Sequence, residues 1–156
     1  MFRNFYRCEA CRHEWTDVWS ATCDDDCPEC GARHMSPYKS EDAADPAEAA
    51  RIRDLNDALR TTFTGGRVLM TAGVAALPKS LTAHVLQRVR SFQQFDRDND
   101  PDGEHDFGAF DVDGRMFFWK IDYYDPDMDG GSEDPSDPSD PNETARVLTI
   151  MLASEY

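Results

Sequence analysis

The stretch FGAFDVDGRMFFWKIDYY, residues 107–124, decides how the larger part of this 156-residue chain folds. Asp113-Gly114 lies at its middle, and Asp-Gly is the dipeptide that a two-residue type I′ hairpin turn prefers. Apolar and polar side chains alternate on both sides of the turn, which is typical of strands. The stretch therefore predicts a β-hairpin of residues 107–112 and 115–124. One face of the second strand is expected in the core, and it comprises Phe117, Trp119, Ile121 and Tyr123.

Two helices and two further strands are predicted around this hairpin. Asp45 can serve as an N-cap, Pro46 suits the first helical position and Glu48 completes a capping box, so a helix begins here. Its core-facing stripe comprises Ile52, Leu55, Leu59 and Phe63. A second helix begins near Pro78, and its apolar face comprises Leu81, Val85, Val89 and Phe92. Strands are predicted at 67–71 and 146–152, and the latter is expected to be central because both of its faces are apolar. The prediction is an α+β domain of order α-β-α-β-β-β with two helices and a mainly antiparallel sheet.

Two x2-spaced cysteine pairs near the N-terminus contain four of the five cysteines: Cys8, Cys11, Cys27 and Cys30. Each pair can form a tight turn that directs two sulfurs at one ion, and four thiolates make a closed tetrahedral zinc site. Together with strands predicted at 2–7 and 13–19, the pattern resembles a zinc ribbon over residues 1–36. One structural zinc ion is therefore expected, and it would fold the unit rather than do chemistry. Rubredoxin-like iron is the alternative, although rubredoxins separate their cysteine pairs by a longer insert.

Three other soft side chains lie near these pairs and could serve as alternative ligands: His13, Cys23 and His34. With four better-spaced sulfurs present, Cys23 is expected to be a small side chain in the loop of the ribbon. No basic cluster is visible in the sequence that would lower its pKa and make it a nucleophile.

The sequence thus predicts three segments: a zinc ribbon at 1–36, a polar linker at 37–45 and an acidic α+β domain at 46–156. The formal net charge is −15, and residues 96–140 alone contain 16 acidic against three basic residues. Such a field repels nucleic acid and membrane phosphates and attracts basic partners or cations. A protein partner with a basic surface is expected, and direct nucleic-acid binding is not. Because no leader or membrane-length apolar segment is recognised, a cytoplasmic location is expected.

Two acidic loops match the first half of a calcium-binding loop, Asp98–Gly103 and Asp125–Gly130. The glutamate that closes such a loop is absent from both, because position twelve is Ala109 in the first and Ser136 in the second. A solvated turn is therefore favoured over Ca²⁺ at either loop.

A second candidate site combines Glu104, His105 and Asp106 with Lys120 and Asp122. A nuclease-like site needs carboxylates that converge on a cation, with a lysine or histidine close by, and these residue types are present. An ordinary ion pair along one strand face explains Lys120 and Asp122 equally well. No catalytic residue is assigned for this reason, and an enzyme is the less favoured interpretation.

Three stretches resemble a known bacterial family: LNDALRTTFTGGRVLMTAGVAAL at 55–77, GEHDFGAFDVDGRMFFWKIDYYD at 103–125 and RVLTIMLASEY at 146–156. The family is domain-of-unknown-function family 3768, found mostly in alphaproteobacteria and often on mobile or accessory DNA. The resemblance covers residues 55–156. Because the family has no assigned biochemical function, the resemblance names the domain and implies no mechanism.

These observations favour a non-enzymatic, zinc-binding, acidic protein-interaction module of a bacterial accessory or mobile-element system. One alternative is an anti-defence nucleic-acid mimic, whose carboxylates would imitate phosphates and occupy a basic groove. The other is a divalent-metal-dependent hydrolase that uses residues 104–106 and Asp122.

Overall fold

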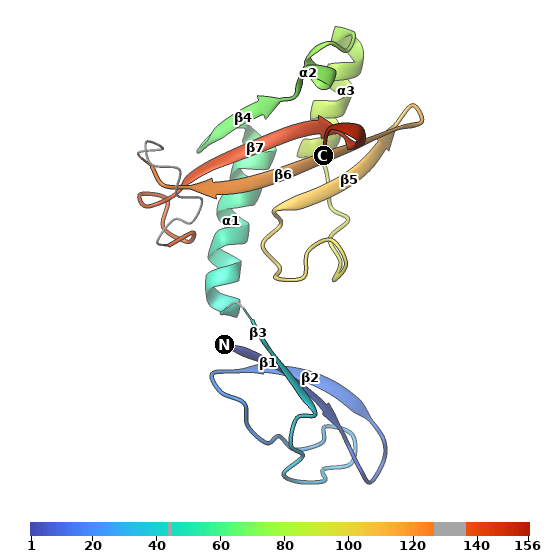
Figure 1. The fold of residues 1–156 in the computed structure, drawn as a ribbon, viewed down its shortest axis with the longest axis vertical. Helices are drawn as coiled ribbons and strands as arrows, with labels where there is room; N and C mark the ends of the chain where they lie inside the picture. Colours follow the sequence, from blue (N-terminus) through green and yellow to red (C-terminus); the bar gives the residue numbers. More distant parts are fainter. Residues whose placement is uncertain (44, 127–136) are drawn as a thin grey trace. The chain divides into compact units, whose positions relative to one another are not determined.

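The computed structural model describes residues 1–43, 45–126 and 137–156 (Figure 1). The chain divides into two compact units, Met1–Asp45 and Pro46–Tyr156. Among the described residues, no helix combines the length and the apolar character needed to cross a membrane.

The first unit contains a three-stranded antiparallel sheet of order β2-β1-β3. Its strands are β1 Phe2–Arg7, β2 Glu14–Trp19 and β3 Lys39–Asp42. The segment 37–45, expected to be a linker, therefore contributes a strand, which pairs with β1 from Phe2↔Asp42 to Phe5↔Lys39. All four side chains of β3 are exposed, so it shows no apolar alternation. Besides the backbone pairing, the hydroxyl of Ser40 donates to the side-chain oxygen of Asn4 at 2.6 Å, and Nζ of Lys39 lies 5.0 Å from the ring centroid of Phe5.

Aromatic stacking and hydrogen bonds attach the loop after β2 to this sheet. Tyr6 is fully buried and its hydroxyl donates to the carbonyl oxygen of Cys23 at 2.9 Å. Trp15 stacks on Tyr6 with ring centroids 5.1 Å apart, and its Nε1 donates to Asp25 at 2.9 Å. The half-buried Cys23 thus lies in the loop, as expected from the sequence.

The second unit contains a four-stranded sheet of order β4-β7-β6-β5. Its elements are α1 Pro46–Thr62, β4 Arg67–Met70, α2 Ala72–Ala75, α3 Lys79–Arg90, β5 Phe107–Val112, β6 Arg115–Tyr124, β7 Ala145–Leu152 and the 3-10 helix η1 Ala153–Glu155. β7 pairs antiparallel with β6 and parallel with β4, so it is internal to the sheet, as predicted. The α+β class and the mainly antiparallel sheet are confirmed, and the four-residue α2 is an addition to the two predicted helices.

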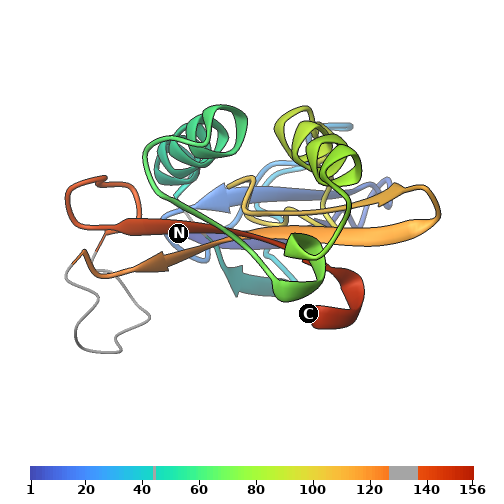
Figure 2. The ribbon, with the colours of Figure 1, turned by 90° about the horizontal axis from the view of Figure 1, so that it is seen from above.

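Helices α1 and α3 both lie on one face of this sheet (Figure 2). The alternation predicted for the hairpin is present, because Phe117, Trp119 and Ile121 are buried on this face. A Cβ at Gly108 would lie 2.4 Å from Nε1 of Trp119, so the large indole requires a glycine on the neighbouring strand. Other core members include Leu59, Val74, Val85, Val89, Phe92, Phe110, Leu148 and Ile150.

The buried side of α1 is more polar than the sequence pattern suggested. Asn56 and Arg60 are 0% and 2% exposed, whereas Leu55 of the predicted stripe is only half-buried. Phe63 lies beyond the helix, with φ 59°, and its N–H donates to the carbonyl oxygen of Leu59 at 2.7 Å. The helix therefore ends at Thr62, before the Gly65-Gly66 pair of the sequence.

Candidate metal centre

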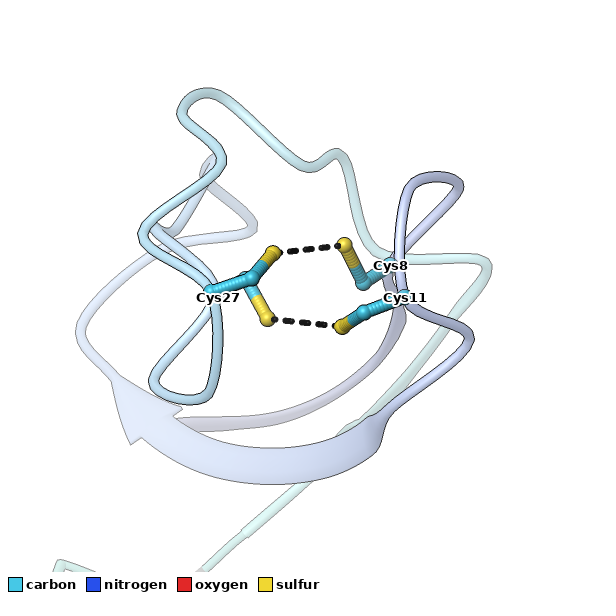
Figure 3. Close-up of side chains that lie close together, drawn as sticks. Cys8, Cys11 and Cys27 are labelled. Carbon is cyan, nitrogen blue, oxygen red and sulfur yellow. Dashed lines mark hydrogen bonds between the residues drawn. The ribbon is translucent and has the colours of Figure 1, made fainter.

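The first unit brings its two cysteine pairs together at one point (Figure 3). Cys8 directly follows β1, and Cys27 lies close to an isolated bridge between Asp25 and Met35. The sulfur atoms of Cys8 and Cys30 lie 3.6 Å apart, those of Cys11 and Cys27 lie 3.7 Å apart, and all four lie within 4.8 Å of one another.

The two pairs fold into the same hydrogen-bonded turn. The N–H of Arg12 donates to the carbonyl oxygen of Cys8 at 2.9 Å, and that of Gly31 donates to Cys27 at the same distance. In return, the N–H groups of Cys8 and Cys27 donate to the carbonyl oxygens of His13 and Ala32, each at 2.8 Å. Because of this turn, both sulfurs of a pair point to the same side, although only two residues separate the cysteines.

The residue after each pair adopts a left-handed backbone conformation, with φ 63° at Arg12 and 71° at Gly31. Only glycine adopts this conformation without strain, and other residues lose roughly 1 kcal/mol there. Arg12→Gly is therefore expected to stabilise the first unit by about 1 kcal/mol, and Gly31→Ala to destabilise it by a similar amount. Nothing lies within 4 Å of a Cβ at Gly31, so backbone strain alone is tested there.

Competition of each variant with a chromogenic zinc chelator measures this difference as a shift in apparent metal affinity. Arg33→Gly is a control that changes a neighbouring exposed arginine at an ordinary φ. Equal affinities of Arg12→Gly and wild type would contradict the turn geometry.

The sulfur positions fit a tetrahedral zinc ion. With Zn–S bonds of about 2.3 Å, tetrahedral geometry places two sulfurs about 3.8 Å apart, close to the observed 3.6 and 3.7 Å. A disulfide would require about 2.05 Å, so the cysteines are paired by proximity and not by a covalent bond. Four soft sulfur donors without an oxygen ligand also match the donor set of structural zinc sites.

The close approach of the four thiols gives them different pKa values. Hydrogen bonding from the N–H of Cys11 is the main cause that lowers the pKa of Cys8, to about 7. At Cys11 the N–H of His13 also acts to lower the pKa, but desolvation and the neighbouring thiols outweigh it and raise the pKa to about 12. The pKa of Cys30 is likewise raised, in spite of the N–H of Ala32. Four negative sulfurs at this spacing therefore need a cation to coexist.

In the described part of the chain, this quartet is the one group of three or more cysteine, histidine or acidic side chains whose ligand atoms lie together. His13 stacks against Trp15 with ring centroids 6.1 Å apart, and His34 is exposed. Neither histidine joins the sulfurs, so the arrangement is a four-sulfur site.

His105, the histidine of the second candidate site, contacts side chains of the α+β unit. Its Nδ1 lies 2.9 Å from a carboxylate oxygen of Asp57, and its Nε2 lies 3.7 Å from Asp100. The ring of His105 stacks on Phe95 with centroids 3.6 Å apart, and its side chain is 21% exposed. Arg60 donates to the other oxygen of Asp57 at 2.7 Å. Both ring nitrogens of His105 therefore face carboxylates of the protein itself.

Glu104 belongs to a polar network that sequence patterns did not indicate. Tyr123 donates to Glu104 at 3.2 Å, Asn56 donates to the hydroxyl of Tyr123 at 2.7 Å, and the buried Arg146 donates to Asn56 at 3.1 Å. Burial raises the pKa of Glu104 and also that of Asp106, and it lowers the pKa of Arg146. The one available signal was the position of Asn56 four residues after Ile52, on the buried side of α1.

The remaining candidates form a local ion pair. Lys120 lies 2.9 Å from Asp122 two residues along β6, on the strand face opposite to Trp119 and Ile121. This pairing raises the pKa of Lys120. His105 packs through Phe95 against the indole of Trp119, on the other side of the strand. The five residues proposed for a nuclease-like site therefore do not converge in the described structure.

The first acidic loop also points its central carboxylate inward. One oxygen of Asp100 accepts the N–H groups of Glu104 and His105 at 2.9 and 3.0 Å, so this side chain holds the turn together. Asp98 and Asp102 are exposed. Most of the second loop, 125–130, lies outside the described residues.

The geometry defines a chain of two parts: a unit with a four-cysteine group that could hold a metal ion, and an α+β unit in whose described residues no group of three or more potential metal ligands lies together. The chain belongs to a family of proteins of unknown function, DUF3768, whose model matches residues 70–155. The match lies within the α+β unit and leaves the cysteine unit outside it. No curated protein and no solved structure matches the chain.

Proposed function

We propose that this protein is a non-enzymatic interaction module, in which one zinc ion folds the first unit and the acidic second unit binds a basic protein partner. The closed sulfur quartet supports the first part of the proposal. With four protein sulfurs as ligands, a tetrahedral ion keeps no open position for water or substrate, so it acts as a structural centre.

The loop 96–106 is the surface that supports the second part. The exposed carboxylates of this loop include Asp96, Asp98 and Asp102. One oxygen of Asp96 accepts the N–H groups of Asp98 and Asn99 at 2.9 and 3.2 Å, and Asp100 holds the following turn. The loop therefore presents negative charge in an ordered backbone, and it would itself lose little conformational freedom when a partner binds.

Charge decides the class of partner. Of the six carboxylates in residues 96–106, those of Asp96, Asp98 and Asp102 are exposed, and the one basic residue is Arg97. Such a surface favours Lys- and Arg-rich proteins and accelerates their association, an effect that salt screens. The same negative surface would also allow the protein to act as a nucleic-acid mimic. In that alternative, the basic partner is itself a nucleic-acid-binding protein.

An affinity capture from bacterial lysate tests the proposal with a triple variant, Asp96→Asn/Asp98→Asn/Asp102→Asn. Asparagine keeps the acceptor oxygen of residue 96, so the loop turn is preserved. Wild type is expected to retain a basic partner in the presence of calcium and magnesium chelators, and the triple variant is expected to lose most of it. Capture should also weaken steeply as salt increases.

The charge-matched control is Glu9→Gln/Asp17→Asn/Glu29→Gln, which removes three exposed carboxylates from the first unit. This control is expected to capture as well as wild type. Equal loss in both triple variants would show that only the net charge matters. Displacement of the partner by added DNA would identify the mimic alternative.

A further inference from the structure

The β4 edge of the four-stranded sheet carries exposed apolar side chains. In the described part of the chain, β4 has a strand on one side only, β7. Leu69 and Met70 are 51% and 44% exposed, and they are adjacent on the edge strand; in the rest of the described sheet the comparably exposed large apolar side chain is Met116 of β6, at 47%. Exposed apolar side chains on an edge strand mark a site for pairing with another strand.

The backbone of β4 leaves a definite set of groups unpaired at this edge. The N–H of Thr71 donates to the carbonyl oxygen of Ile150 in β7 at 3.0 Å. Because backbone groups alternate along a strand, Leu69 also faces β7, whereas Val68 and Met70 direct their N–H and C=O groups outward. The residues with outward N–H and C=O groups, Val68 and Met70, are two positions apart. This is the spacing between successive hydrogen-bonded positions of an antiparallel strand pair.

We propose that two copies of this chain pair antiparallel through β4, with the two-fold axis at Leu69. In this register Val68 lies opposite Met70 of the partner strand, and each such pair exchanges two backbone hydrogen bonds. Leu69 lies opposite its own copy at a non-hydrogen-bonded position, where side chains come closest. The pairing joins two four-stranded sheets into one and covers both exposed side chains.

A second copy fits this edge better than an unrelated strand does. A symmetric interface needs a patch that is complementary to itself, and β4 supplies donors, acceptors and apolar side chains in a two-fold arrangement. The acidic loop 96–106 leads into β5, at the opposite edge of the sheet. Pairing through β4 therefore leaves the two acidic loops at the outer edges of the joined sheet, away from the interface.

Disulfide trapping of the full chain tests the register, in a Cys23→Ser background with zinc present. Leu69→Cys is expected to form a 69–69 cross-link under mild oxidation, because directly opposite Cα atoms lie within disulfide range. Met70→Cys is the matched control, since its side chain would face Val68 of the other copy and not itself. Peptide mass mapping distinguishes the 69–69 link from links of the native cysteines. No cross-link at 69, or an equal one at 70, would overturn the proposal.

The solution mass gives a second readout that needs no cysteine. Sedimentation of the wild type is expected to approach twice the chain mass of 17.7 kDa at high concentration, and Leu69→Lys to stay at one chain mass. The control Met116→Lys changes another exposed methionine, on β6, and should dimerise like the wild type. So small an interface is expected to be weak, and a wild type that stays at one chain mass at about 0.5 mM would overturn the proposal.

Discussion

Cys27→Ser is expected to abolish metal binding and to unfold residues 1–45, while residues 46–156 stay folded. A serine hydroxyl is neither ionised nor soft, so the ion would keep only three of its sulfur ligands. Structural zinc contributes roughly 10 to 16 kcal/mol in small zinc-binding peptides. Few side chains of the first unit are buried enough to replace it: Asn4, Tyr6, Cys8 and Cys27. Hydrogen exchange followed peptide by peptide, with metal analysis of the same sample, measures both effects.

Cys23→Ser is the matched control for this experiment. It removes a thiol from the same unit, but Cys23 lies outside the sulfur quartet. Its backbone carbonyl oxygen accepts the hydrogen bond from Tyr6, and a serine keeps this group. This variant should bind one metal ion and exchange slowly, like the wild type. Protection of β1 and β2 in metal-free protein would contradict the assignment of the ion as the main source of stability.

Arg60→Met is expected to destabilise the α+β unit by about 2 to 4 kcal/mol, since it removes a buried cation together with its hydrogen bonds to two backbone carbonyls and to Asp57. Arg60 donates to the carbonyl oxygens of Val89 and Arg90 at 2.9 and 3.1 Å, at the C-terminal turn of α3. Its guanidinium also lies 5.5 Å from the ring centroid of Trp119. Methionine fills a similar volume, so little of the effect would come from a cavity.

Urea unfolding monitored by the far-ultraviolet signal of the helices gives this change in free energy. The control Arg53→Met replaces a half-buried arginine of the same helix and should change stability by less than about 0.5 kcal/mol. Asp57→Ala, alone and combined with Arg60→Met, separates the ion pair from the bonds to α3. If the double variant is as unstable as the sum of the single ones, the ion pair contributes nothing.

Local sequence patterns predicted those parts that depend on residues close in the chain. The hairpin turn is an example, because Asp113 and Gly114 both adopt left-handed conformations, with φ 53° and 76°, as a type I′ turn requires. The convergence of the cysteines could also be predicted, since each pair needs only its own turn and the short spacing between pairs limits the alternatives. The central place of β7 followed from apolar residues on both of its faces.

Features that depend on distant partners could not be predicted in this way. The strand β3 has no apolar pattern and exists because the edge of β1 accepts it. The bond between Asn56 and Arg146 joins residues 90 positions apart, and neither residue type indicates burial. The residue types next to His105 in the sequence were those of a reactive site. Only the fold shows that Asp57 and Asp100 flank its ring.

The position of β3 determines where the chain can be cut for separate study. Because this strand follows the second cysteine pair and pairs with β1 as far as Asp42, a fragment that stops at residue 36 would expose one edge of β1 from Phe2 to Phe5, while the other edge stays paired with β2. An unprotected strand of this kind promotes aggregation even when the metal is bound. Fragments meant to isolate the metal-binding part should therefore extend at least to Asp42, and a tag placed at residue 37 would separate two hydrogen-bonded strands.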